Sequence, residues 1–460
     1  MLGKQPVPSK WLRKIAITAA VAVVSGLASY SHSYAASPSI SVEVDGVLQQ
    51  GLVPTFQHGN TLLPLDSVAS AIGAAAEWKG DGKSVTLRQG KRTVTFTAGT
   101  RTVLVNGKSS PLSDAPKITG GKWWIPVRIT VEAFGGQVEW DKASKTLDIV
   151  PRLHAYSANG KWGYVNVFGD TVVSPQFDEA RSFSEGLAVV KQGGKYGYAN
   201  LQGNIVVTPQ YDTAYDFSDG LALIVKDGVS GYVDANGKQV LTPKYDELFD
   251  FSEGLALVRS GDLFGYIDHT GKEAIPLQYE DAFYFSGGLA GVQVEGKYGY
   301  IDRTGGTVVA PRFQSVADVS EGLGLVQDDG SFGYIAAAGG YAISPSYAKA
   351  FPFSEGLAAV ENDGKFSYID HKGKTVITTE FEDAGNFHDG LAYFVKDGKY
   401  GYIDAKGKVV IQPQYDSVED FDHGLAVVIK DGAASLINTK GISVAKTEIP
   451  AEDSPAPSAS

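Results

Sequence analysis

The sequence contains no cysteine. The chain therefore has no disulfide framework, no thiolate metal site and no cysteine nucleophile, and its stability must come from burial alone. Histidine is scarce as well, with seven in 460 residues. No two histidines stand at a metal-binding spacing such as i, i+4 on a helix. We accordingly expect no metal, no cofactor and no catalytic residue.

Long apolar runs are missing after the N-terminus. The run 15–27 is shorter than the roughly 18 to 20 residues of a membrane-spanning helix. Basic residues precede it and small residues follow it: Lys4, Lys10, Arg13 and Lys14, then Ser33, Tyr34 and Ala35. This pattern predicts a secretory signal peptide over residues 1–35, with an uncleaved anchor as the alternative. We expect a mature chain that is not transmembrane and is secreted, extracellular or cell-wall associated. The missing cysteines are compatible with a Gram-positive source.

Positive charge is sparse in the larger part of the chain. From residue 151 onward 24 basic residues stand against 42 acidic ones, a net charge of −18. Such a surface repels phosphate backbones, so nucleic acid is excluded as a partner. Cations, basic proteins and neutral glycans remain compatible with it.

A 34-residue repeat without insertions organises the chain from residue 152. Its first marker is a Gly-Tyr pair, with Ser-Tyr once, at Gly163, Gly197, Gly231, Gly265, Gly299, Gly333, Ser367 and Gly401. Its second marker is a Gly-Leu pair, at Gly186, Gly220, Gly254, Gly288, Gly322, Gly356, Gly390 and Gly424. Self-similarity at a fixed period predicts a repeat architecture.

One repeat is predicted to form three short strands. Residues 221–225, 231–234 and 239–242 are rich in β-branched and apolar residues, with turns between them, and Pro243 ends the third. Glycines and β-branched residues exclude the two-helix repeat of the same length. Nine such units over 152–446, the last with the character of a cap, predict a mainly β fold. An open, solenoid-like superhelix is favoured, and a β-propeller is the alternative.

This unit resembles the WG repeat family of bacterial proteins. The resemblance rests on motifs such as Gly160-Lys161-Trp162-Gly163-Tyr164, Ser252-Glu253-Gly254-Leu255-Ala256 and Pro209-Gln210-Tyr211-Asp212, and only the first unit keeps the tryptophan. The family implies a β-rich interaction scaffold with no defined reaction.

An older duplication with a spacing of 62 residues precedes the array, over residues 36–151. Its paired features are Leu63-Pro64-Leu65 with Ile125-Pro126-Val127, Gly73 with Gly135, and Trp78 with Trp140. Each half is predicted to contain a hairpin, turning at Asp45-Gly46 or Asn106-Gly107, and a short helix, over 65–72 or 127–134. The segment resembles the N-terminal stalk domain of copper amine oxidases. The resemblance implies no copper and no amine oxidation, because the oxidase chemistry belongs to another domain.

Two repeated sets of side chains are candidate binding residues. An acidic ladder precedes the Gly-Leu marker: Glu185, Asp219, Glu253, Glu321, Glu355 and Asp389. Stacked repeats would align it into a column that binds cations or a basic partner, or else its members are turn residues that help to satisfy nearby backbone donors, and the turn role is favoured. An aromatic face precedes the Gly-Tyr marker: Trp162, Tyr196, Phe264, Tyr298, Phe332, Phe366 and Tyr400. These rings either stack on sugars or pack as core, and packing is favoured.

A further set of carboxylates is interpreted as structural. It consists of Asp234, Asp268, Asp302, Asp370 and Asp404, each three residues before a glycine. Asn166 and Asn200 replace this aspartate in two units, which a catalytic acid would not allow. The position predicts Asx-type turns.

The sequence thus predicts an exported, non-enzymatic scaffold of the cell envelope or extracellular space, with an acidic array that binds an extracellular protein or a cell-wall or glycan polymer. A polysaccharide-active hydrolase with a site in a groove of the array is the alternative. The sequence leaves the oligomeric state open, and residues 447–460 read as a disordered tail.

Overall fold

The structure is a computed structural model that describes residues 40–57, 59–80, 82–379 and 381–447. The predicted signal peptide lies outside the described residues, as does the predicted tail apart from Thr447. The described chain forms two compact units. The middle unit comprises residues 241–409, and the terminal unit comprises the residues on both sides of it, up to 240 and from 410.

The stalk domain opens the terminal unit and contains three small sheets and two short helices. Its sheets have the strand orders β12-β13-β1-β2, β10-β11-β4-β3 and β5-β6-β7-β8-β9. The elements are β1 (Ser41–Val44), β2 (Val47–Leu48), β3 (Thr55–Gln57), β4 (Asn60–Pro64), α1 (Leu65–Ala71), β5 (Ala75–Trp78), β6 (Ser84–Gln89), β7 (Arg92–Thr97), β8 (Thr102–Val105), β9 (Lys108–Pro111), β10 (Lys117–Thr119), β11 (Lys122–Pro126), α2 (Val127–Ala133), β12 (Gln137–Asp141) and β13 (Thr146–Val150). No helix in the described ranges is long and apolar enough to cross a membrane.

The internal duplication of the stalk domain is visible in its structure. Helices α1 and α2 occupy equivalent positions, and the chain leaves each through a glycine of positive φ, +70° at Gly73 and +91° at Gly135. One core holds both halves together, with Leu63 and Ile125 fully buried on paired strands. The predicted helices and hairpin turns are confirmed.

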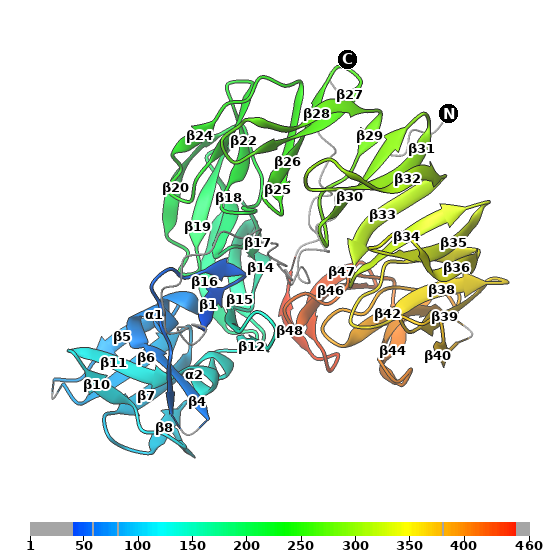
Figure 1. Cartoon of the computed structure of the whole chain (residues 1–460). Helices are drawn as coiled ribbons and strands as arrows, with labels where there is room; N and C mark the ends of the chain where they lie inside the picture. Colours follow the sequence, from blue (N-terminus) through cyan, green and yellow to red (C-terminus); the bar gives the residue numbers. More distant parts are fainter. Residues whose placement is uncertain (1–39, 58, 81, 380, 448–460) are drawn as a thin grey trace, which may run out of the picture. The chain divides into compact units, whose positions relative to one another are not determined.

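Each repeat contributes one antiparallel sheet, and Figure 1 labels many of the strands. The first sheet has three strands: β14 (Leu153–Ala158), β15 (Lys161–Asn166) and β16 (Thr171–Phe177). The next four sheets are β17 (Glu179–Ser184), β18 (Leu187–Gln192), β19 (Lys195–Asn200), β20 (Ile205–Tyr211); β21 (Thr213–Ala214), β22 (Ala222–Lys226), β23 (Val229–Val233), β24 (Gln239–Leu241); β25 (Glu247–Ser252), β26 (Leu255–Ser260), β27 (Leu263–Asp268), β28 (Glu273–Tyr279); and β29 (Asp281–Ala282), β30 (Leu289–Val294), β31 (Lys297–Asp302), β32 (Thr307–Phe313). The last four are β33 (Ser315–Ser320), β34 (Leu323–Asp328), β35 (Ser331–Ala336), β36 (Tyr341–Tyr347); β37 (Lys349–Ala350), β38 (Ala358–Asn362), β39 (Lys365–Ile369), β40 (Thr375–Thr378); β41 (Asp383–Ala384), β42 (Leu391–Lys396), β43 (Lys399–Asp404), β44 (Val409–Tyr415); and β45 (Ser417–Val418), β46 (Leu425–Lys430), β47 (Ala433–Asn438), β48 (Ser443–Lys446).

The mainly β, tandem-repeat fold is confirmed, but the prediction of three strands per repeat is wrong. After the first sheet, every sheet has a fourth strand, which precedes the Gly-Leu marker. In β33 this strand carries a β-bulge between Val316 and Val319, so its side chains do not alternate regularly. The opposite edge strand carries a proline in most repeats, such as Pro311 in β32, which suits an unpaired edge.

The first and last repeats contact each other within the terminal unit. His154 Nε2 on β14 lies 3.2 Å from the carbonyl oxygen of His423, and the Ser157 N–H donates to Thr447 Oγ1 at 3.2 Å. A buried cluster that includes Val165 and Leu436 joins the two sheets.

The stalk domain is anchored on the first two repeats. Arg92 Nε donates to the Asp170 carboxylate at 2.8 Å, and its guanidinium lies 3.3 Å from the centre of the Phe168 ring. At Gly73 a Cβ would come within 2.9 Å of the Leu201 carbonyl oxygen, so the glycine permits close contact with the second repeat.

Candidate functional site

The acidic ladder occupies the same turn in each repeat, between the first and second strands of the sheet. Each ladder residue has a positive φ, from 51° at Asp389 to 56° at Glu185, and is followed by a glycine that also has a positive φ. Two successive residues of positive φ are the requirement of a type I′ hairpin. Asparagine or glycine usually takes the first of these positions, so we expect the side chain of a glutamate there to have a further structural or binding role.

The glutamate carboxylates link each repeat to the next one. Each accepts a hydrogen bond from the backbone N–H of the glycine in the equivalent turn, 35 residues further on. The donors and distances are Gly220 to Glu185 (3.0 Å), Gly288 to Glu253 (2.9 Å), Gly356 to Glu321 (3.1 Å to each oxygen) and Gly390 to Glu355 (2.8 Å). The four glutamates of the ladder are therefore fixed carboxylates.

The stalk domain supplies the same contact to the first glutamate turn. Asp45, in the β1–β2 hairpin with φ 54°, accepts a hydrogen bond from the Gly186 N–H at 3.2 Å. Sequence reasoning did not assign this role to Asp45. The signal was present, because Asp45-Gly46 is the same acid-glycine pair as Glu185-Gly186.

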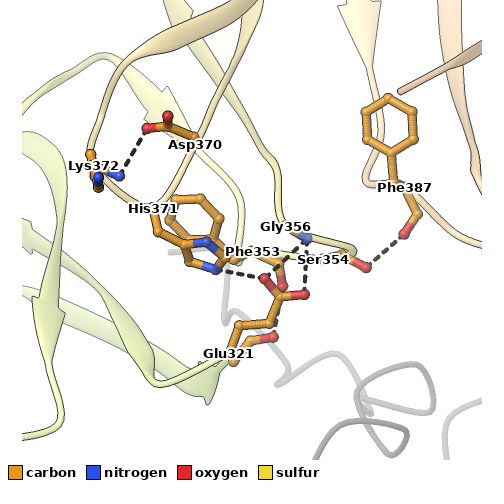
Figure 2. A network of polar contacts seen from close by, with 9 residues as sticks. Glu321, Phe353, Ser354, Gly356, Asp370, His371, Lys372 and Phe387 are labelled. Atoms are coloured by element: carbon orange, nitrogen blue, oxygen red, sulfur yellow. Dashed lines mark hydrogen bonds and ion pairs between the residues drawn. The ribbon is translucent and has the colours of Figure 1, made fainter. Parts of the chain in front are cut away.

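Around Glu321 the contacts extend to a histidine (Figure 2). His371 Nε2 lies 2.7 Å from Glu321 Oε2, and its ring stacks on Phe353 with centroids 4.6 Å apart. Ser354 Oγ donates to the carbonyl oxygen of Phe387 in the next repeat at 2.6 Å. The side chain of Glu321 is only 11% exposed, so little of this carboxylate is open to solvent.

The tyrosine of the Gly-Tyr marker makes another link between repeats. Tyr300 is fully buried, and its hydroxyl donates to the Ala317 carbonyl oxygen at 2.7 Å. Equivalent tyrosines donate to the residue 17 positions further on: Tyr164 to Arg181, Tyr198 to Tyr215, Tyr266 to Phe283, Tyr334 to Phe351 and Tyr368 to Gly385. The marker that reveals the repeat is thus a packing device.

The aromatic face lies against the core beside these tyrosines. Phe366 belongs to a buried cluster, and its neighbours in the set are half-buried. Tyr196 and Tyr298 also use their hydroxyls, which donate to Glu179 Oε2 at 2.7 Å and to Asp281 Oδ2 at 2.6 Å. Burial, together with the bond to Asp281, raises the pKa of Tyr298. These rings pack against the sheet, and sugar stacking by them stays the alternative to the favoured role in packing.

The predicted Asx-type turns are confirmed. Asp302 Oδ1 accepts hydrogen bonds from the N–H groups of Thr304 (2.8 Å) and Gly306 (2.9 Å), and Asn166 Oδ1 makes the equivalent bonds to Phe168 and Asp170. Bonds from the hydroxyl and the N–H of Thr304 lower the pKa of Asp302. In contrast, burial raises the pKa of Glu355 in the ladder.

The described residues contain no group of three or more histidine, aspartate or glutamate side chains arranged to hold a metal ion. The carboxylates of the ladder are spaced by whole repeats, and each of its four glutamates is tied to a backbone N–H. Glu355 is exposed and Glu185 and Glu253 are half-buried, so these members of the ladder can present negative charge to a partner, whereas Glu321 contributes little.

Comparison with known families divides the chain in two. The copper amine oxidase N-terminal domain matches residues 44–149. The WG containing repeat matches more than half of the chain in eight segments: 162–196, 196–229, 231–263, 264–298, 298–331, 332–366, 366–400 and 400–432. None of the curated proteins matches the chain.

Three solved structures that resemble the chain have low sequence identity to it. A crystal structure of the eukaryotic initiation factor is 12% identical, covers 64% of this chain and 94% of that chain, and has a TM-score of 0.46. Kluyveromyces lactis Hsv2p is 11% identical over 55% of this chain and 90% of its own, with a TM-score of 0.28. YCF48 bound to D1 peptide is 11% identical over 46% and 87%, with a TM-score of 0.29. The family matches are decisive: the chain belongs to the WG repeat family and carries a copper amine oxidase N-terminal domain before its repeats.

Proposed function

We propose that the protein is an exported, non-enzymatic scaffold of the cell envelope or extracellular space. Its acidic repeat array presents a binding surface to an extracellular protein or to a cell-wall or glycan polymer. The stalk domain holds the first repeat through Arg92 and the second through Asp45. Export rests on the basic, apolar and small residues of the segment 1–35.

The observation that carries this proposal is the regular placement of carboxylates on rigid turns. Glu253, Glu321 and Glu355 stand at the same end of sheets in the middle unit, each held by a glycine N–H of the following repeat. Fixed like charges raise the local potential more effectively than mobile ones, because no ordering is needed when a cationic partner binds. The net charge of −18 from residue 151 onward supports a partner with basic groups.

The test is retention of the mature chain, residues 36–460, on purified cell wall and on extracellular protein at low and high salt. A ladder variant carries Glu185→Gln, Glu253→Gln, Glu321→Gln and Glu355→Gln, because the amide oxygen of glutamine still accepts the glycine N–H. The control variant carries Asp227→Asn, Glu295→Gln, Asp363→Asn and Asp397→Asn. These four also have positive φ, and they lie in the hairpins at the opposite end of the sheets.

We expect salt-sensitive retention of the parent chain. The ladder variant should lose this retention, and the control variant should keep it. Equal loss of retention in both variants would show that retention depends on the total negative charge and not on the position of the ladder carboxylates. If the parent chain is not retained and turns over a substrate in a glycan screen, the scaffold function is contradicted and the polysaccharide-active hydrolase is favoured.

A further inference from the structure

A pocket of about 260 Å³ lies where the first and last repeats of the terminal unit meet. The linker before β14 contributes Arg152, the turn between β15 and β16 contributes Val167 and Phe168, and the last repeat contributes Gly424 and the turn 438–440. The pocket thus requires the contact between the two ends of the array.

The pocket has the opposite charge to the array around it. Its lining includes Arg152 and Lys440 and no carboxylate, although acidic residues greatly outnumber basic ones in this part of the chain. The guanidinium of Arg152 is held in place by the Gln137 side-chain oxygen. In the last repeat, Asn438 Oδ1 accepts the N–H of Lys440 at 3.0 Å and that of Ile442 at 3.1 Å, which fixes the turn.

The remaining wall of the pocket is apolar and equally well fixed. Phe168 lies under the Arg92 guanidinium, which is also bonded to Asp170. Phe168 occupies the repeat position that Lys440 occupies in the last unit, so the first and last repeats contribute different chemistry from equivalent turns. A ligand with an anionic group and a less polar body would match both walls.

We propose that this pocket binds an oxyanion, a phosphate or carboxylate group of an extracellular ligand. Arg152 and Lys440 supply two positive charges to the pocket, and the Thr439 hydroxyl adds a donor. The bound group would join the linker to the last repeat and so stabilise the contact between the ends of the array. This inference is independent of the acidic ladder and concerns a partner of opposite charge.

The experiment is a titration of the mature chain, residues 36–460, with sodium phosphate at constant ionic strength, followed by calorimetry and by the thermal unfolding temperature. Acetate and glycerol phosphate are parallel arms that separate a carboxylate from a phosphate and a free ion from a phosphoester. Lys440→Gln removes one charge without entering the core. Lys406→Gln is the matched control, because Lys406 holds the same turn position in the preceding repeat.

Phosphate or acetate should bind the parent chain and raise its unfolding temperature above that in chloride. Lys440→Gln should weaken binding about tenfold, the usual effect of losing one charge-assisted hydrogen bond. Lys406→Gln should leave binding unchanged, and Arg152→Lys, which keeps the charge but loses the guanidinium, should weaken it as well. Identical behaviour in phosphate, acetate and chloride would overturn the proposal, and so would equal losses in the two glutamine variants.

Discussion

The glycine and the tyrosine of the Gly-Tyr marker recur in the repeats for different structural reasons. The tyrosine crosses to the next repeat, as Tyr300 does to Ala317. The glycine lets the outer strand cross closely, because a Cβ at Gly299 would stand 2.3 Å from the Val309 carbonyl oxygen. Ser367 replaces the glycine in the seventh repeat, and there the outer strand β40 is only four residues long. The third repeat keeps the glycine, Gly231, and has an even shorter outer strand, β24 with three residues, so the glycine alone does not set the length of this strand.

Gly299→Ala should lower the free energy of unfolding by about 2 kcal/mol or more, because backbone atoms must move to admit the methyl group. Gly340→Ala is the control, since a Cβ at Gly340 meets nothing within 4 Å and its φ is not positive. That variant should range from unchanged to about 1 kcal/mol more stable. Urea unfolding of both variants checks the difference, and equal stabilities would contradict the close-approach argument.

The turn carboxylates predict a dependence of stability on pH. Bonds from Thr304 lower the pKa of Asp302 in the folded chain. A carboxylate with a lowered pKa adds stability above its unfolded pKa of about 3.9, and that stability is lost as the pH falls through the folded pKa. Asp302→Asn should therefore be less stable than the parent at pH 7. The gap should narrow as the pH falls below about 4.

Urea unfolding at pH 3, 5 and 7 measures this gap. The variant should fold, because Asn166 and Asn200 already hold the same turn with the same backbone donors. A gap that stays constant across the three pH values would show that the charge of Asp302 is irrelevant to the turn.

At the scale of elements, the sequence revealed the repeat period and three of the four strands. The fourth strand escaped prediction for a physical reason. Segments such as 315–320 mix polar and apolar residues and contain a bulge, and the equivalent strand β29 has only two residues. Strand alternation is the signal that sequence reasoning uses, and a bulge removes it.

The acidic ladder was located by its spacing, but its contacts could not be derived from the sequence. Glu321 and its donor Gly356 lie 35 residues apart on neighbouring sheets, and a period states which residues are equivalent without stating which ones touch. For the same reason, the sequence did not reveal the contact of Asp45 with the repeats, because Asp45 belongs to another domain. The contact depends on how sheets pack, which is a property of tertiary structure.

Glu321→Ala should cost about 1 to 2 kcal/mol of stability, because the Gly356 N–H loses a charged acceptor. Glu321→Gln should cost less, since an acceptor oxygen remains. Glu295→Ala is the matched control: Glu295 has a φ of 50°, close to the 52° of Glu321, and lies in the other hairpin. The backbone strain of the substitution is therefore equal, and chemical denaturation isolates the contact between repeats. A loss in Glu295→Ala as large as in Glu321→Ala would assign the effect to the turn.

At the scale of the whole molecule, the contact between the first and last repeats is the feature that composition and period could not predict. It depends on how far each sheet is rotated from the preceding one, and no residue pattern encodes that rotation directly. The residues that form the contact are distinctive, however. His423 stands where six other repeats carry an acid, and it contacts His154, which is 7% exposed.

The absence of cysteine allows this contact to be tested directly, because an introduced pair would be the only thiols in the chain. Ser157→Cys with Thr447→Cys joins positions that are in hydrogen-bond contact although 290 residues apart. Oxidation should give an intramolecular disulfide, visible as faster migration of the denatured chain on a gel and reversed by reductant. Each single variant controls for intermolecular coupling. Because closing so long a loop restricts the unfolded chain, the bond should stabilise the protein by up to about 5 kcal/mol. If the ends of the array were apart in solution, the double variant would behave like the single variants, and the pocket lined by Arg152 and Lys440 would not form.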